Sequence, residues 1–248
     1  MTEARKTLLL LGGTSDIGRA VAAEYAANGW NIILTVRDSD AGERNAADLR
    51  VRHNANVRVL KFDLLRPEDR DSLMRNLDTT PDTVVSALGM LGDQARAETD
   101  LAHAREVLIS NFEGPALLLG FFAGQMAKRG TGTIVGISSV AGDRGRATNY
   151  VYGSAKAGFT AFLSGLRNRL ATKGIHVLTV KPGFVRTKMT EGMKLPPALT
   201  AEPQEVARRV YRAAEVKKSD LIYVRPVWRL VMAIIRAIPE ARFKKMKI

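Results

Sequence analysis

Short apolar runs recur along the chain, separated by stretches long enough to form helices. Seven of these runs are rich in leucine, isoleucine, valine or threonine and have the length of β-strands. They are Leu8–Leu11, Asn31–Val36, Val57–Phe62, Thr83–Ala87, Thr133–Ser138, His176–Lys181 and Leu221–Val224. The segments between them have helical character: Ile17–Asn28, Ala41–His53, Pro67–Asn76, Leu101–Lys128, Tyr150–Lys173 and Pro203–Val216. The pattern therefore predicts strands and helices in alternation.

Strands that alternate with helices form a parallel sheet with helices packed on both of its faces. No repeat or low-complexity linker divides the 248 residues. We therefore predict an α/β fold of the Rossmann type: a doubly wound, seven-stranded parallel sheet with helices on both faces. In such folds ligands bind beyond the carboxyl ends of the strands.

The charge of the chain is concentrated at its C terminus. The net charge is +13, from 38 Lys and Arg against 25 Asp and Glu, and the pI is near 10.3. Val227–Ile238 is apolar with Arg229 and Arg236 interspersed, and further basic residues follow it. This tail is too short to span a bilayer, but it can lie on an anionic membrane surface or pack against a neighbouring subunit. We therefore divide the chain into a catalytic domain, 1–225, and a basic amphipathic tail, 226–248.

Several classes of site and location are disfavoured. The chain has no cysteine, and His53, His103 and His176 share no ligand spacing, so we expect no metal site. The first apolar run is too short for a secretory signal. We expect a cytoplasmic protein, with peripheral contact at the inner membrane face if the tail binds lipid. No nucleic-acid-binding module accompanies the positive charge, so we expect no nucleic-acid partner.

A glycine-rich turn, Gly12–Gly18, lies between the first predicted strand and the first predicted helix. Glycines there allow the backbone to approach a pyrophosphate, whose charge the helix N-terminus stabilises. The second strand ends at Arg37-Asp38. An arginine at this point accommodates the 2′-phosphate of NADP(H), whereas an acid binds the ribose 2′-hydroxyl of NAD(H). Arg37 favours NADP(H), and Asp38 keeps NAD(H) open.

Tyr152 and Lys156 are spaced to lie on one face of a helix. A phenol has a reference pKa near ~10, and a neighbouring cation lowers that pKa toward the neutral range, where the phenol can transfer protons. Ser139, thirteen residues before Tyr152, follows the fifth strand, where its hydroxyl can polarise a carbonyl. Pro182–Thr187 follows the sixth strand.

Taken in order, these motifs resemble the short-chain dehydrogenase/reductase family over essentially the whole chain. The matching residues are Gly12, Gly18, Asn111, Ser139, Tyr152, Lys156 and Pro182-Gly183…Thr187. The resemblance implies that Tyr152 exchanges the proton with the substrate oxygen, and that Lys156 lowers the pKa of Tyr152 and binds the nicotinamide ribose. Ser139 would orient the carbonyl, and Asn111 would hold a water that links Lys156 to solvent.

The resemblance also implies a set of cofactor-binding residues. Asp63 would contact the adenine, Ala87 and Gly89 the adenosine, and Thr187 the nicotinamide side. The full set is Gly12, Thr14, Ser15, Asp16, Ile17, Gly18, Arg37, Asp63, Leu64, Ala87, Gly89, Tyr152, Lys156, Pro182, Gly183, Val185 and Thr187.

The chain departs from the family pattern at two places. Asp16 replaces the middle glycine of the glycine-rich turn, so its side chain is expected to point away from a pyrophosphate, toward the helix N-terminus. Ser86-Ala87-Leu88-Gly89 replaces the usual Asn-Asn-Ala-Gly.

These departures resemble one branch of the family, whose members reduce decaprenylphosphoryl-2-keto-erythro-pentofuranose to its arabinose epimer beside a flavin-dependent oxidase. The resembling segments are Leu10–Gly18, Gly89–Asp93, Val151–Gly158, Val185–Met189 and the tail. A homodimer or homotetramer is the family expectation. Two alternatives stay open: a 3-oxoacyl-carrier-protein or other small-ketone reductase, and a non-catalytic dinucleotide-binding regulator.

Overall fold

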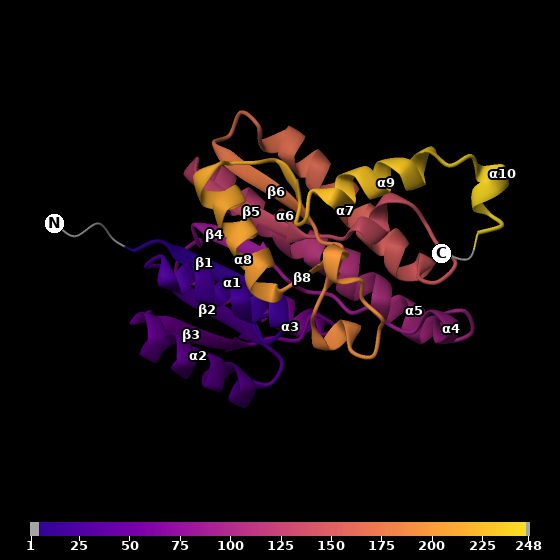
Figure 1. The fold of residues 1–248 in the computed structure, drawn as a ribbon. Coiled ribbons are helices and arrows are strands. Elements are labelled where there is room, and N and C mark those ends of the chain that lie inside the picture. Colours follow the sequence, from indigo (N-terminus) through magenta and orange to yellow (C-terminus); the bar gives the residue numbers. More distant parts are fainter. Residues whose placement is uncertain (1–4, 247–248) are drawn as a thin grey trace.

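A seven-stranded parallel sheet forms the centre of the protein, as predicted (Figure 1). The computed structural model describes residues 5–246. The strand order is β3-β2-β1-β4-β5-β6-β9 and every neighbouring pair is parallel. The strands are β1 Thr7–Leu11, β2 Asn31–Val36, β3 Val57–Lys61, β4 Thr83–Ser86, β5 Gly132–Ile137, β6 Ile175–Lys181 and β9 Leu221–Tyr223. A separate two-stranded sheet pairs β7, Phe184–Val185, with β8, Thr200–Ala201.

Helices cover both faces of the sheet because the strands are apolar on both sides. In β1, Leu8 and Leu10 pack into one core and Leu9 and Leu11 into the other. The first core is closed by α1 Asp16–Ala27, α2 Ser39–His53 and α8 Pro203–Tyr211. The second is closed by α3 Pro67–Arg75, α6 Gly114–Arg129 and α7 Tyr150–Leu170. The prediction of helices on both faces is therefore confirmed.

Two helices that the sequence predicts as continuous are interrupted by π-helical turns. The segment predicted as Leu101–Lys128 consists of α5 Leu101–Leu108, a π-helical turn Ile109–Glu113, and α6. Pro115 has no N–H to donate to the carbonyl of Asn111, which explains why regular α-helical bonding fails there. Similarly, Pro203–Val216 ends in a π-helical turn, Arg212–Val216.

Several short elements were not predicted. They are α4 Gln94–Ala97, α10 Glu240–Phe243, and 3₁₀ turns at Val140–Asp143, Lys188–Thr190 and Pro197–Leu199. Within the described residues, the helical stretch Leu101–Arg129 is long and apolar enough to cross a membrane, but half of its most apolar window is buried in the protein. That burial is typical of a core helix.

The predicted tail begins with α9, Val227–Ala237, whose inner face is part of the core. Trp228 and Met232 are buried against Val140, whereas Leu230 and Ile234 are exposed. Figure 1 shows α9 and α10 at the end of the molecule opposite the N terminus.

One arginine holds the end of the tail. The Arg144 guanidinium donates to the carbonyls of Ile235 and Ile238, both at 2.6 Å, and lies 3.6 Å from the centre of the Phe243 ring. Lys247, the last basic residue of the predicted tail, lies outside the described residues.

Candidate active site

A pocket of about 830 Å³ lies beyond the carboxyl ends of β1, β4, β5 and β6. It brings together most of the predicted site residues: Thr14, Ser15, Asp16, Ile17, Ala87, Gly89, Asn111, Ser139, Tyr152, Lys156, Pro182, Gly183, Val185 and Thr187. Five predicted residues are not on its wall: Gly12, Gly18, Arg37, Asp63 and Leu64. The strand order reverses between β1 and β4, so the pocket occupies the position expected for a doubly wound sheet.

The glycine-rich turn is closely packed around the start of α1. Gly12 has a φ of +91°, which favours glycine, and a β-carbon at Gly18 would overlap the Gly12 carbonyl oxygen. The Ser15 hydroxyl accepts a hydrogen bond from the Gly18 N–H at 3.0 Å and so caps the helix. The close backbone packing at Gly12 and Gly18 and the helix N-terminus form a cradle that suits the pyrophosphate of a dinucleotide.

Asp16 points to a different partner from the one the sequence suggests. Its carboxylate accepts a hydrogen bond from the Lys188 N–H at 2.8 Å, at the start of the 3₁₀ turn Lys188–Thr190. The expectation that it faces the N-terminus of its own helix is wrong, because Ser15 already caps that helix. Asp16 therefore links the glycine-rich turn to the segment that follows β7.

The two charged residues at the end of β2 have different environments. The Asp38 carboxylate caps α2, accepting from the N–H groups of Asp40 and Ala41 at 3.0 and 3.1 Å. Arg37 is exposed, and the described residues offer it no hydrogen bond or ion pair. The acid that kept NAD(H) open thus caps α2 through its Oδ1 alone, whereas the arginine is available.

The predicted adenine-side residues lie beside β3. The Asp63 carboxylate accepts from the Leu65 N–H at 3.0 Å. The Leu64 side chain does not face the pocket, because it is buried against Gly114 in the core. Any contact of Leu64 with a cofactor would therefore involve its backbone.

Tyr152 and Lys156 lie one turn apart near the start of α7. The Lys156 Nζ is 5.8 Å from the centre of the Tyr152 ring and donates to the Ile137 carbonyl at 3.1 Å. Ser139 follows β5, its hydroxyl accepts from the Ala141 N–H at 3.1 Å, and its proximity lowers the pKa of Tyr152. The three side chains thus meet in one pocket.

Asn111 is fully buried in the π-helical turn. Its Nδ2 donates to the carbonyls of Met90 and Val107 at 2.7 and 2.8 Å, which fixes the amide. Its Oδ1 has no hydrogen-bond partner among the described residues. A β-carbon at Gly89 would lie 2.6 Å from this oxygen and 3.3 Å from the Lys156 Nζ, so glycine is required there. The orphaned oxygen beside Lys156 suits a bound water.

The pKa values in the pocket differ from the sequence-based expectation. Burial raises the pKa of Tyr152, although the hydrogen bond with Ser139 and the charge of Arg146 act in the opposite direction. Burial lowers the pKa of Lys156 to about 7. Burial thus weakens Lys156 as a cation, and Arg146 is the cation whose charge lowers the pKa of Tyr152.

An ion pair supports the turn that carries Ser139. Lys181, at the end of β6, pairs with Asp143, and the Tyr223 hydroxyl donates to the other oxygen of that carboxylate at 2.8 Å. Burial and this carboxylate raise the pKa of Tyr223 to about 12. The network ties the Val140–Asp143 turn to β6 and β9.

The sequence analysis missed much of the pocket wall, including the side chains of Gln94, Arg146, Asn149 and Trp228. Arg146 and Asn149 lie between Ser139 and Tyr152, so this spacing could have drawn attention to them. Trp228 comes from the tail, packs against Gly183 and donates its indole N–H to the Leu199 carbonyl at 2.9 Å. No local sequence signal connects Trp228 to the site.

Comparisons with known proteins agree with this geometry. Residues 6–196 match the family described as short chain dehydrogenase. An uncharacterized oxidoreductase of Mycobacterium tuberculosis is 37% identical over 242 residues, covering 96% of each chain. An uncharacterized oxidoreductase of Streptomyces coelicolor is 35% identical, covering 98% of this chain and 96% of its own.

Solved structures have the same fold. A short chain dehydrogenase/reductase family protein has a TM-score of 0.80 at 29% identity, covering 90% of this chain and 97% of its own. A short-chain dehydrogenase from Sphingobium yanoikuyae, solved with NADPH, has a TM-score of 0.82 at 24% identity and covers 96% and 98%. The chain therefore belongs to the short-chain dehydrogenase/reductase family and is an oxidoreductase of that family.

Proposed function

We propose that the protein reduces ketones, or oxidises the corresponding secondary alcohols, with a nicotinamide dinucleotide. The observation that carries this proposal is the meeting of Tyr152, Lys156 and Ser139 in one pocket with the glycine cradle at α1. The dinucleotide, when bound, supplies or accepts the hydride. The raised pKa of Tyr152 keeps its phenol protonated at neutral pH, which is the state needed to donate a proton to a carbonyl oxygen.

The other three polar groups support that proton transfer. The Ser139 hydroxyl orients the carbonyl oxygen beside the phenol. Lys156 is placed to bind the nicotinamide ribose, and Asn111 to hold a water that links Lys156 to solvent. This assignment is tested by following NADPH oxidation with ketone probes. We expect Ser139→Ala to reduce kcat by about a hundredfold without weakening NADPH binding; unchanged kcat would exclude the role of Ser139.

We propose NADP(H) as the preferred cofactor. Arg37 is free to bind a 2′-phosphate, whereas Asp38 is held at the start of α2 by the two capping bonds to its Oδ1. The Sphingobium yanoikuyae protein was solved with NADPH, which is in keeping with this preference. The test compares kcat/KM with NADPH and with NADH. Arg37→Ala should lower the NADPH-to-NADH ratio by about tenfold; an unchanged ratio would mean that Arg37 does not set the preference.

For the substrate, we propose a polyprenylphosphoryl 2-keto-pentofuranose, with a flavin-dependent oxidase as the partner that makes it. The support is the resemblance of Leu10–Gly18, Gly89–Asp93 and the tail to that branch of the family. The alternative is a 3-oxoacyl thioester, since a 3-oxoacyl-carrier-protein reductase of Aquifex aeolicus is 29% identical over 218 residues. Comparing turnover of the keto-sugar phospholipid with that of acetoacetyl thioester distinguishes them. If the protein binds NADPH but turns over neither the keto-sugar phospholipid nor the acetoacetyl thioester, a non-catalytic regulator is favoured.

We further propose that the tail is a peripheral membrane contact. Exposed Leu230 and Ile234 lie on one side of α9, among basic residues that add about 1 kcal/mol each at an anionic surface. Truncation near Arg225 would remove buried Trp228, so the test uses a Leu230→Asp, Ile234→Asp double variant. Loss of sedimentation with anionic liposomes would support the contact. Unchanged lipid binding would refute it, and a changed oligomeric state would indicate a subunit interface instead.

A further inference from the structure

We propose that Arg146 and Asn149 form a recognition subsite for a phosphorylated, hydroxylated ketone at the substrate end of the pocket. The inference rests on the proposed ketone reduction and names the substrate class of the same site. Both residues lie on the pocket wall, in the segment that joins the Ser139 turn to α7. Neither belongs to the four groups assigned to proton transfer.

Arg146 is a cation without a counter-ion. Its Nε is buried and has no hydrogen-bond partner among the described residues, and no ion pair involves it there. Arg144, two residues earlier, is fully engaged by tail carbonyls and by Glu240. Arg146 is half-buried, and a ligand can complete the buried Nε that has no partner; the planar donors of a guanidinium suit a phosphate or carboxylate.

The acids on the pocket wall do not neutralise Arg146. The Asp16 carboxylate is bonded to the Lys188 N–H, and the Asp93 carboxylate caps α4 through the Arg96 N–H at 3.0 Å. The other cations on the wall are Lys156, which faces the ribose side, and Lys188, which is exposed. The substrate end therefore presents a net positive charge to an incoming molecule.

Asn149 supplies an acceptor beside this cation. It is the N-cap residue of α7, yet its side chain makes no capping hydrogen bond, and its Oδ1 is buried without a partner among the described residues. An oxygen in this position accepts from a hydroxyl. The start of a 21-residue helix also favours a negative charge nearby.

The two groups lie within reach of the reacting carbonyl. The charge of Arg146 acts on the pKa of Tyr152, which places the guanidinium close to the phenol. A compact keto-sugar phosphate can therefore place its carbonyl at Tyr152, its phosphate at Arg146 and a hydroxyl at Asn149. A 3-oxoacyl chain has neither a hydroxyl nor an anion beside its ketone.

The test uses D-ribulose 5-phosphate and D-ribulose, two probes that differ only in the phosphate. We expect wild-type kcat/KM to be at least about tenfold higher for the phosphorylated ketone, as typical of hydrogen bonds to charged groups. Arg146→Gln should reduce this preference to about twofold, and Arg146→Lys should keep part of it. The ratio between the two probes is the readout, because losing the charge of Arg146 also raises the pKa of Tyr152 and so affects both probes alike. Asn149→Ala should lower kcat/KM for both probes and keep the ratio.

Arg169→Gln is the matched control, because Arg169 is exposed at the far end of α7. The subsite is refuted if the phosphate preference is absent in the wild type, survives Arg146→Gln, or is lost equally in Arg169→Gln. If neither ketone is reduced, the proposed function fails. The subsite is then tested by calorimetry, which measures binding of D-ribulose 5-phosphate in the presence of NADP⁺. Tenfold weaker binding of D-ribulose 5-phosphate by Arg146→Gln would support it; equal binding, or none by the wild type, would refute it.

Discussion

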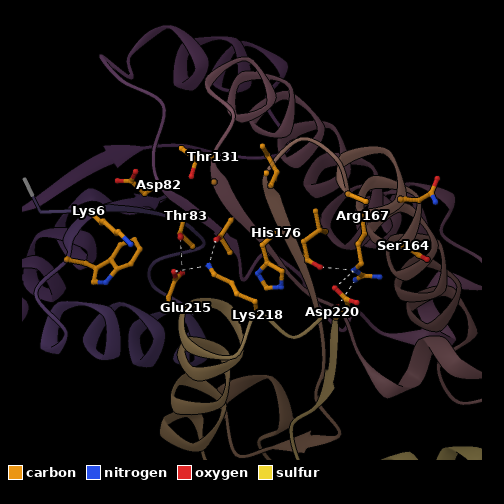
Figure 2. Close-up of a pocket in the computed structure, with 18 residues that line it drawn as sticks. Lys6, Asp82, Thr83, Thr131, Ser164, Arg167, His176, Glu215, Lys218 and Asp220 are labelled. Atoms are coloured by element: carbon orange, nitrogen blue, oxygen red, sulfur yellow. Dashed lines mark hydrogen bonds and ion pairs between the residues drawn. The ribbon is translucent and has the colours of Figure 1, made fainter.

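Two pockets of almost equal volume lie at opposite edges of the sheet, about 830 Å³ at the carboxyl edge and about 810 Å³ at the amino edge. Figure 2 shows the second, where charged side chains are paired with one another and with the backbone. Glu215 accepts from the hydroxyls of Tyr25 and Thr83, at 2.9 and 2.8 Å. Arg167 donates to the carbonyls of Val177 and Asp220.

At the carboxyl edge, by contrast, buried polar atoms are left without partners among the described residues: Asn111 Oδ1, Arg146 Nε and Asn149 Oδ1. The amino edge has one such atom, His176 Nδ1. Burial lowers the pKa of His176, so the ring stays neutral and its unpaired nitrogen is less costly than an unpaired charge. Unmet hydrogen-bonding capacity, rather than volume, distinguishes a pocket built for a ligand from one built for stability.

The largest effect should come from the phenol at the carboxyl edge. Tyr152→Phe removes the proton donor, and we expect kcat to fall by about a thousandfold, within the usual range for a general acid, with NADPH binding retained. Thr83→Val at the amino edge should leave kcat within about twofold. Stopped-flow or steady-state NADPH oxidation measures kcat for both variants. A comparable loss of kcat in the two would contradict the view that only the carboxyl-edge pocket is catalytic.

The amino edge should show its role in stability. Glu215→Ala leaves the buried Tyr25 hydroxyl and the Thr83 hydroxyl unpaired, which should lower the free energy of unfolding by about 2–4 kcal/mol without changing kcat. Arg146→Gln, which removes a half-buried cation that has no counter-ion among the described residues, should leave the free energy of unfolding unchanged or raise it. Urea denaturation gives both values. A loss of stability in Arg146→Gln equal to that in Glu215→Ala would contradict the comparison.

The smallest effect is a pH dependence at the carboxyl edge. With a pKa of about 7, Lys156 is protonated below neutral pH and loses its charge above it, so kcat/KM for NADPH should fall as pH rises through about 7. The Tyr152 phenol stays protonated over this range, because its pKa is raised. Lys156→Arg should move the fall above pH ~9, since a guanidinium keeps its proton. If kcat/KM of Lys156→Arg falls at the same pH as that of the wild type, the titrating group is not Lys156.

How far the sequence predicts the structure depends on whether the signal is local. The strand Asn31–Val36 was predicted with its observed bounds, because an apolar run ends at a charged residue. The π-helical turn around Asn111 was not predicted, since a helix with one widened turn keeps nearly the same apolar spacing, although Pro115 was a usable sign.

The composition of the pocket depends on contacts between distant residues. The glycine-rich turn, Ser139, Tyr152 and Lys156 were found because each lies directly after a strand or at helical spacing. The partner of Asp16 lies 172 positions away, and Trp228 reaches the pocket from the tail. Such contacts between distant residues decide whether a carboxylate or an arginine has a partner. The sequence alone therefore could not show that Arg144 is bonded to the tail while the Nε of Arg146 has no partner among the described residues.

The position of Trp228 has a consequence for how this chain can change over generations. Its indole closes one wall of the pocket, while Leu230 and Ile234 on the outward side of the same helix are exposed. Substitutions on the outer side can accumulate and change which surface or partner the outer face of α9 binds. Shortening the chain before Trp228 would open the pocket to water, so α9 cannot be lost even where its outer surface binds nothing.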